Sequence, residues 1–337
     1  MDKKVIFAVV GSGKTTHIVS RLSNSKRSLI VTYTTANYEN LRKKITEKFN
    51  GVWPASVTLM TYFSFLFGFC YKPFLSDKYK ARGLIYEPNS NTFIRQTSLE
   101  YYMTKNRYLY SNRLALLLEK ECVLNDIMMR IQTYFDEFII DEVQDIAGRD
   151  FTFLENLMEN SVNMLFVGDF YQHTFDTSRD GKVNSTLFDS KVKYETRFTK
   201  KGFKIDNATL KNSWRCSQSI CEYISVNLGI NISSNRPEGD NTIIEFVDNK
   251  QQIEYLLADE NIVKLHYQNG AKYGPNHKNW GESKGEDHHE DVCVMLNKNT
   301  AKKRHSGNLC ELPPSTKNKL YVAITRARGN VYLINDF

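Results

Sequence analysis

The residues with the clearest chemical potential form a glycine-rich run near the N-terminus, GSGKTT at residues 11–16. An apolar run at residues 5–10 precedes it, which predicts a buried strand that leads through a tight loop into a helix. Glycines let backbone N–H groups approach an anion closely, and the helix dipole points at the same place. Lys14 would add a positive charge for the β and γ phosphates of a nucleotide, and Thr15 a hydroxyl for Mg²⁺.

The order of strand, loop and helix favours a phosphate site over the alternative, an ordinary glycine-rich turn with an exposed lysine. The pattern G-x-x-x-x-G-K-[ST] usually begins with glycine, and the small residue Ala8 stands there in this chain. The residues expected to bind the nucleotide in this loop are Ala8, Gly11, Ser12, Gly13, Lys14, Thr15 and Thr16.

A second chemical signal is the acidic end of an apolar run, FDEFIIDEVQDI at residues 135–146. The run predicts a strand that ends in two carboxylates at the edge of a sheet, beside the phosphate loop. Asp141 would hold Mg²⁺ through water, and Glu142 would orient and deprotonate the attacking water. The alternative is an exposed acidic turn.

A further buried strand is predicted in NMLFVGDFYQHTF, residues 163–175, and it also ends in polar residues. We expect Gln172 to lie against the γ-phosphate, where an amide senses the phosphate without adding charge. Asp169 would support the metal side of the site or the loop.

The elements that must position these residues alternate between strands and helices. Residues 28–45 predict a buried strand, a polar turn and an amphipathic helix, and residues 57–65 predict a third strand with hydroxyls and aromatic rings at its far end. This alternation predicts an α/β fold with a parallel sheet and the ligand at the carboxyl ends of the strands. Pro313 and Pro314 predict a loop over residues 312–319, since proline blocks a helix.

The segment 71–113 differs in character, with eight Lys or Arg against three acidic residues and nine aromatic residues among them. Cations that follow a phosphate backbone, beside rings on which bases stack, are what single-stranded nucleic acid requires of a surface. The alternative is a small helical subdomain with the rings in its core and a solvated basic face. The sequence leaves both interpretations open.

Composition limits the class of protein. The 337 residues carry 45 Lys and Arg against 38 Asp and Glu, a formal net charge of +7, and 41% are hydrophobic. This length accommodates about two domains, and the positive charge favours a polyanionic partner or simply solubility. The six cysteines lack a C-x-x-C pair, which favours reduced thiols in the cytoplasm. No run approaches ~18 consecutive apolar residues, so we expect no membrane span.

Eight segments, in order, resemble the motifs of the UvrD/Rep/PcrA-like branch of superfamily 1 DNA helicases. They are AVVGSGKT (8–15, motif I), VTYTTAN (31–37, Ia), LMTYFSF (59–65), IIDEVQD (139–145, II), VGDFYQHTF (167–175, III), LKNSWRCS (210–217, IV), WGESKGEDHHEDVCVML (280–296, V) and LYVAITRAR (320–328, VI). Motif III ends here in Phe175 in place of tyrosine. A phosphate-loop kinase would leave motifs IV to VI without a role.

The resemblance implies two RecA-like P-loop NTPase lobes with parallel sheets and ATP between them. We expect the first lobe at residues 1–205, with a small helical insertion at about 66–134, and the second at 206–337. By this similarity Arg215 and Arg326 reach the γ-phosphate and Trp214 stacks on adenine, although a core tryptophan is the alternative for Trp214. Gly285 would belong to the nucleotide site.

The resemblance also implies a path for nucleic acid. The residues expected to contact the strand are Tyr33, Thr34, Asn37, Tyr62, Phe63, Ser64, Ser283 and Lys284. A cluster of histidines and cysteines around residues 277–310 has spacing that matches none of the usual zinc patterns.

The expected function is an ATP-dependent DNA helicase or translocase that uses Mg²⁺ and ATP to move 3′ to 5′ along single-stranded DNA, alone or in a tailed duplex. Only residues 218–279 separate motifs IV and V, where full-length relatives insert a large subdomain. The alternative is therefore a nucleotide-gated DNA-binding ATPase module with little unwinding, which regulates a protein partner such as a nuclease or a replication or defence complex.

Overall fold

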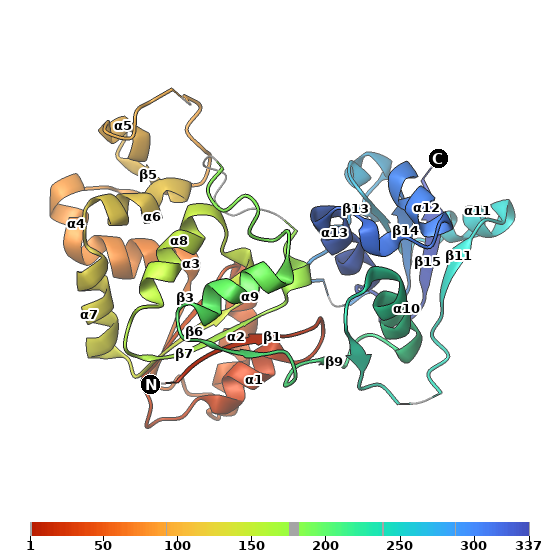
Figure 1. Ribbon diagram of the computed structural model, residues 1–337, viewed down its shortest axis with the longest axis horizontal. Coiled ribbons are helices and arrows are strands. Elements are labelled where there is room, and N and C mark those ends of the chain that lie inside the picture. The colour runs from red at the N-terminus through yellow and green to blue at the C-terminus, as the bar shows by residue number, and fades with distance from the viewer. Residues whose placement is uncertain (1, 92, 175–181, 238, 287, 337) are drawn as a thin grey trace. The chain divides into compact units, whose positions relative to one another are not determined.

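The computed structural model describes residues 2–91, 93–174, 182–237, 239–286 and 288–336, drawn in colour in Figure 1. They divide into two units. The first comprises the described residues of Met1–Ile6, Thr15–Gly168 and Asp176–Asp206, and the second those of Phe7–Lys14, Asp169–Phe175 and Asn207–Phe337. The division of the chain into lobes at residue 205 stays a prediction, and Phe175 itself lies outside the described residues.

The first unit is built around a six-stranded sheet with the strand order β3-β2-β6-β7-β1-β8. The strands are β1 (Lys3–Phe7), β2 (Ser28–Thr32), β3 (Val57–Thr61), β6 (Glu137–Asp141), β7 (Asn163–Gly168) and β8 (Lys204–Asp206). The pairs β2–β3, β2–β6, β6–β7 and β1–β8 are parallel. Every residue of β2 and β6 is buried, as expected for the apolar strands of a parallel sheet covered on both faces. The predicted strands are present and pair in parallel, but two of them are shorter than predicted. β1 ends at Phe7 although the apolar run continues to Val10, and β3 ends at Thr61, after which Tyr62–Ser64 are helical.

Helices connect these strands. The helices of the first unit outside its insertion are α1 (Lys14–Arg21), α2 (Thr35–Lys48), α8 (Gly148–Leu157) and α9 (Lys191–Thr199). α2 begins after Thr34 because the Thr34 side chain accepts a hydrogen bond of 3.1 Å from the Asn37 backbone N–H and so caps the helix.

The insertion between β3 and β6 is helical, as the sequence predicts. Its elements are α3 (Tyr62–Ser64), a π-helical stretch (Phe65–Tyr71), α4 (Lys72–Tyr79), β4 (Gly83–Ile85), α5 (Leu99–Tyr102), β5 (Tyr108–Tyr110), α6 (Ser111–Lys120) and α7 (Leu124–Tyr134). Figure 1 shows α4, α5, α6 and α7 grouped together at one side of the first unit. The short strands β4 and β5 pair in parallel.

The second unit holds a five-stranded parallel sheet with the order β11-β15-β14-β12-β13. Its strands are β11 (Ile244–Val247), β12 (Val263–His266), β13 (His277–Asn279), β14 (Val292–Leu296) and β15 (Val331–Asn335), and β9 (Asn212–Ser213) pairs separately with β10 (Ser233–Ser234). Successive side chains of a strand point to opposite faces, so β14 sends Val292, Val294 and Leu296 into one apolar cluster and Cys293 and Met295 into another. Both faces of this sheet are therefore covered.

The helices of the second unit are α10 (Gln218–Leu228), α11 (Lys250–Ala258), α12 (Lys298–His305) and α13 (Pro314–Ile324). The loop predicted over residues 312–319 is wrong, because α13 begins at Pro314 and the prolines start the helix. Proline fits the first helical position, where its missing N–H would have had no partner within the helix. Among the described residues, no helix is both long and apolar enough to cross a lipid bilayer.

Candidate functional site

The segment Phe7–Lys14, which contains most of the predicted phosphate loop, belongs to the second unit and packs there against the segment that follows β9. Gly11 and Gly13 have left-handed backbone conformations, with φ of +63° and +86°. A Cβ on Gly11 would lie 2.7 Å from the Arg215 Cβ, and the Trp214 N–H donates to the Gly11 carbonyl over 2.9 Å. Only glycine allows this approach, so the tertiary structure places the predicted phosphate loop directly beside the predicted arginine of motif IV.

The neighbourhood of the two glycines fits a bound phosphate chain. Nothing among the described residues lies within 4 Å of a Cβ built on Gly13, which leaves space beside that backbone. The Ser12 hydroxyl donates to the Val9 carbonyl over 2.7 Å and so holds the turn from within. Lys14 begins α1 and is followed by Thr15 and Thr16. The Thr16 hydroxyl accepts a hydrogen bond from Lys44 of α2 over 3.0 Å, so Thr16 links two helices.

A buried tyrosine of α13 joins the phosphate loop to the motif III segment. The Tyr321 hydroxyl accepts a hydrogen bond from the Val10 N–H over 3.1 Å and donates one to the Asp169 carboxylate over 3.0 Å. The same Asp169 oxygen accepts from the Gln172 side-chain amide over 3.0 Å. Tyr321, Asp169 and Gln172 are 0%, 1% and 5% exposed. These contacts hold Gln172 in one orientation with respect to Val10.

Sequence reasoning missed Tyr321, although motif VI contains it. The available signal was a tyrosine within an otherwise apolar helical run, LYVAI at residues 320–324. A buried tyrosine hydroxyl needs a polar partner, and that partner is usually distant in the sequence. A second side chain of the same helix makes a similar contact, since the Asn318 amide donates to the His173 carbonyl over 3.2 Å.

The two candidate arginines converge on the end of α13. Arg326 is 1% exposed; its Nε donates to the Val322 carbonyl over 3.0 Å. One of its terminal nitrogens also lies near the carbonyls of both Ser283 and Glu286, at 3.5 and 3.4 Å. A terminal nitrogen of Arg215 approaches the Thr325 carbonyl at 3.4 Å. The guanidinium of Arg326 is thus held inside the second unit, and its contact with a γ-phosphate stays a prediction.

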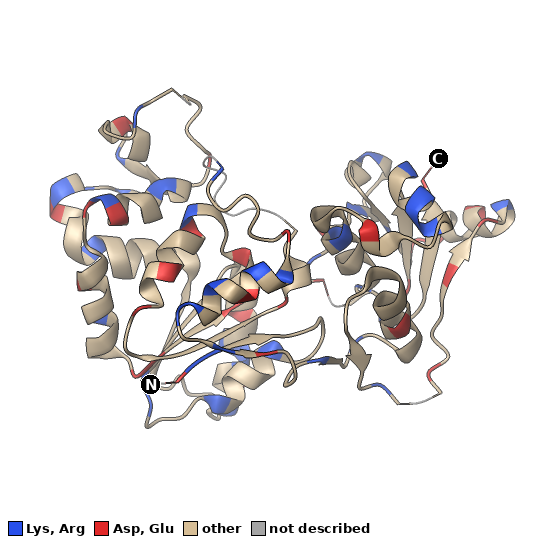
Figure 2. Ribbon diagram, viewed as in Figure 1, with Lys and Arg blue, Asp and Glu red and all other residues tan. Residues whose placement is uncertain are grey.

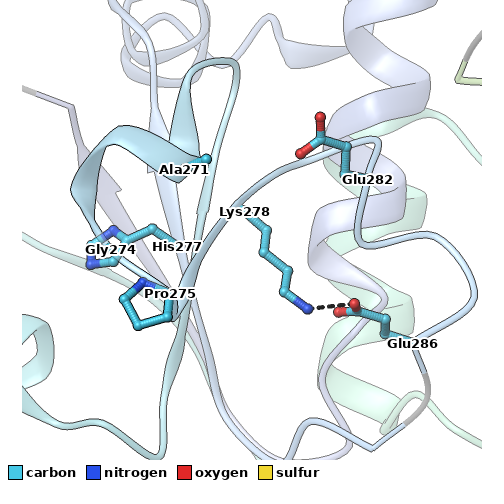
Figure 3. A pocket seen from close by; sticks show the side chains of 7 residues that line it. All are labelled: Ala271, Gly274, Pro275, His277, Lys278, Glu282 and Glu286. Carbon is cyan, nitrogen blue, oxygen red and sulfur yellow. Dashed lines mark hydrogen bonds and ion pairs between the residues drawn. The ribbon is translucent and has the colours of Figure 1, made fainter.

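The motif V loop surrounds this arginine and borders an open pocket of about 630 Å³. Figure 3 shows its lining, which consists of Ala271, Gly274, Pro275, His277, Lys278, Glu282 and Glu286. An ion pair between Lys278 and Glu286 crosses one side of it. Ser283 is fully buried and its hydroxyl donates to the Trp280 carbonyl over 2.7 Å, whereas Lys284 is half-buried and Gly285 is exposed with φ of +89°.

Trp214 is 67% exposed, so it is not the core tryptophan that the sequence left open. That role belongs to Trp280, which is 0% exposed and donates its indole N–H to the Leu265 carbonyl over 2.9 Å. A flat indole beside Gly11 and accessible from outside is suited to stacking on a base.

The acidic residues lie in the first unit, at the carboxyl end of β6. Asp141 is the last residue of the strand and is 2% exposed. Glu142 follows in a left-handed conformation with φ of +59°, which is strained for a residue other than glycine. A Cβ on Gly168 would lie 2.3 Å from a Gln144 side-chain oxygen, so the ends of β6 and β7 are tightly packed.

The donor set of the predicted magnesium site is chemically suitable. A hydroxyl from Thr15 and a carboxylate from Asp141 are oxygen ligands of the kind that Mg²⁺ prefers. Elsewhere, the part of the chain that the structure describes contains no group of three or more His, Cys, Asp or Glu side chains arranged to hold a metal. His266 and His277 instead hydrogen-bond each other over 2.9 Å.

The predicted aromatic contacts for nucleic acid gather at the carboxyl ends of β2 and β3. The Tyr33 ring lies 6.1 Å from Tyr62 and 5.7 Å from Phe63 between centroids. Tyr62 is buried, while Tyr33 and Phe63 are half-buried. Ser64 is exposed, and its hydroxyl accepts from Thr61 over 2.8 Å. The structure therefore brings Tyr33, Tyr62 and Phe63 together in the first unit.

A buried carboxyl lies close to these rings. Asp150 of α8 is 0% exposed, and burial raises its pKa to about 8, although the nearby Tyr62 hydroxyl opposes that shift. Burial also raises the pKa of the Tyr62 hydroxyl well above its usual value, with the Asp150 charge adding to the effect. The aromatic cluster therefore has a buried carboxyl beside it whose neutral form is favoured by burial.

Comparison with known proteins relates this fold to a helicase. No family model matches the chain. No curated protein matches it either. Among solved structures, the chain is similar to the arterivirus nonstructural protein 10, a helicase, in complex with DNA, with a TM-score of 0.51 and 14% sequence identity. The match covers 99% of this chain and 60% of that one.

At this low identity the likeness concerns the fold alone. It agrees with the two parallel sheets described above, and the chain has an α/β fold of two RecA-like lobes with a small helical insertion in the first. The likeness supports a helicase fold in general and does not distinguish the UvrD/Rep/PcrA-like branch.

Proposed function

We propose that this protein is an ATP-dependent DNA helicase or translocase of the UvrD-like type, which hydrolyses ATP to move 3′ to 5′ along single-stranded DNA. The observation that carries the proposal is the packing of the phosphate loop against Arg215 and, through Tyr321, against Asp169 and Gln172. Residues distant in the sequence converge there on the backbone that would hold the phosphates.

In this proposal the phosphate loop binds the β and γ phosphates through its backbone N–H groups and Lys14. Glu142 orients the attacking water and takes its proton, and Gln172 reports the presence of the γ-phosphate. Arg215 and Arg326 stabilise the charge that develops on the phosphoryl oxygens. Trp214 stacks on the base, and Gly285 lines the nucleotide site.

Mg²⁺, held by Thr15 and by Asp141 through water, would neutralise charge on the β and γ phosphates. The strand would lie against Tyr33, Thr34, Asn37, Tyr62, Phe63 and Ser64 of the first unit and against the segment of Ser283 and Lys284. Ser283 would act through its backbone, because its side chain is buried. The similar arterivirus helicase is in complex with DNA, which supports a nucleic-acid partner for this fold. Free thiols at all six cysteines support a cytoplasmic location.

The test is the rate of ATP hydrolysis with and without single-stranded DNA. We expect many-fold stimulation by DNA in the wild type and loss of the signal in Lys14→Ala. Lys43→Ala is the matched control, because Lys43 is an exposed lysine of α2 and should leave the rate unchanged. Comparing the unwinding of duplexes that carry a 3′ or a 5′ tail tests the direction of movement. Comparing duplexes with a DNA tail and with an RNA tail tests which type of strand the protein uses. Hydrolysis that DNA does not stimulate would refute the proposal.

A nucleotide-gated module that regulates a partner such as a nuclease is the second candidate. The interval between motifs IV and V favours it, since its described residues are largely taken up by α10, β11, α11, β12 and β13 of the second unit itself. Such a module would hydrolyse ATP in response to DNA yet separate tailed duplexes poorly. Efficient unwinding by the isolated chain would exclude it.

A further inference from the structure

Three of the nine aromatic residues in segment 71–113 belong to a core. Tyr71, Tyr101 and Tyr102 are 0%, 7% and 2% exposed. The Arg113 guanidinium lies 3.7 Å above the Tyr101 ring and donates to the Tyr101 carbonyl over 2.8 Å, so this cation is structural. For these residues the helical-subdomain interpretation is correct, and their composition carries no argument for binding.

Tyr86 behaves differently. It directly follows β4 and is 63% exposed, yet its ring meets Phe63 edge to face with 5.3 Å between centroids. Phe63 in turn lies 5.5 Å from Tyr62 and 5.7 Å from Tyr33. Four rings therefore form one continuous aromatic surface: Tyr33 directly after β2, Tyr62 and Phe63 on α3, and Tyr86 directly after β4. It runs from the buried Tyr62 to the exposed Tyr86.

The charges of the insertion indicate what this surface could bind. The Arg82 N–H donates to the Arg107 carbonyl over 2.8 Å, which places two exposed arginines together at the start of the β4–β5 pair, whereas Tyr86 follows the end of β4. Lys80 and Lys105 are exposed near them in the sequence, and Glu87 is an exposed acid of the same segment. Figure 2 shows Lys and Arg recurring along the ribbon of the insertion. An insertion that carries both an excess of cations and an exposed ring matches a phosphate backbone with unpaired bases.

We propose that Tyr86 is a base-stacking residue through which the insertion extends the single-strand binding surface beyond Tyr33 and Phe63. The inference rests on the proposed function, since it names a further contact for the same strand. Edge-to-face packing on Phe63 fixes the Tyr86 ring and leaves much of it accessible. A base then stacks on a ring that is already oriented, so little side-chain freedom is lost on binding.

The test is the affinity of the full chain for a fluorescein-labelled oligothymidine, measured by fluorescence anisotropy at one salt concentration. Tyr86→Ala is expected to weaken binding about tenfold, the scale of one lost base–aromatic stack. Tyr86→Phe and Tyr86→Trp should bind as the wild type does, because each keeps a flat ring. Phe93→Ala is the matched control: Phe93 is 93% exposed on the same insertion, and its truncation should not change affinity.

The outcomes separate this inference from the function on which it rests. Binding by Tyr86→Ala at wild-type affinity, or equal weakening by Tyr86→Ala and Phe93→Ala, would overturn the role of Tyr86 while leaving the motor intact. Failure of the wild type to bind the oligonucleotide would overturn the proposed function and this inference together. ATP hydrolysis without DNA should be the same in Tyr86→Ala and wild type, which also shows that the variant is folded.

Discussion

The hydroxyl of Tyr321 offers the sharpest test of how the phosphate loop is held. Tyr321→Phe removes one oxygen and keeps the buried ring, which lies 6.0 Å from the Tyr171 ring. The change leaves the Val10 N–H without its hydroxyl acceptor and takes one donor from the Asp169 carboxylate. Gln172 still donates its hydrogen bond to Asp169, but the Asp169 carboxylate has lost the hydrogen bond from Tyr321 that helped to fix its position.

The magnitude follows from the burial of the groups. A hydrogen bond to a charged group contributes about 1.5–3 kcal/mol, and a buried amide left unsatisfied costs about 1–3 kcal/mol. We therefore expect the second unit to lose about 3 kcal/mol of stability. For a unit of this size that lowers the melting temperature by on the order of 10 °C. Well below the melting temperature, kcat for ATP should fall about tenfold with little change in KM, because the proposed mechanism needs Gln172 against the γ-phosphate and the variant would displace it.

Thermal unfolding and steady-state ATP hydrolysis measure these two effects. Tyr255→Phe makes the same chemical change in the same unit at a side chain that is 71% exposed, so it should alter stability by less than about 0.5 kcal/mol. If Tyr321→Phe melts and hydrolyses ATP as Tyr255→Phe does, the hydroxyl holds neither Val10 nor Asp169, and the reasoning is refuted.

Three further predictions concern other parts of the site. Trp214→Ala should raise KM for ATP about two- to tenfold and leave the melting temperature unchanged, since the ring is exposed; an unchanged KM would argue against stacking. Gly11→Ala should abolish hydrolysis and destabilise the chain more than Gly307→Ala does. Gly307 has a similar φ of +70°, but a Cβ there would not clash with Arg215 as it would at Gly11. Equal melting temperatures for the two variants would contradict this prediction. The pKa of the buried Asp150 is about 8, against its usual value of 3.8. Between about pH 4 and pH 8 the folded state therefore binds a proton that the unfolded state has lost, so the free energy of unfolding should fall as pH rises through this range. Urea unfolding at several pH values should show that the free energy of unfolding depends less on pH in Asp150→Asn than in the wild type. The same pH dependence in both proteins would disprove the prediction.

The local elements of the site could be predicted from the sequence because each depends on residues close together in the chain. The glycine spacing at residues 11–13 predicts the loop, and its left-handed backbone is present. The apolar run that ends at Asp141 predicts β6, which the structure confirms. The prolines before α13 misled the prediction, because the same residue that blocks a helix interior also favours a helix start.

The sequence by itself determined the parallel α/β fold, the helical insertion and a glycine-rich loop between the first strand and the first helix, since strand and helix periodicity and glycine spacing are local properties. Only the tertiary structure decided which side chains meet. It pairs the Tyr321 hydroxyl with Val10 and Asp169, buries Ser283, and exposes Trp214 and Tyr86. These outcomes depend on contacts between residues far apart in the chain. The sequence pattern of one segment does not identify the distant residues that its side chains contact.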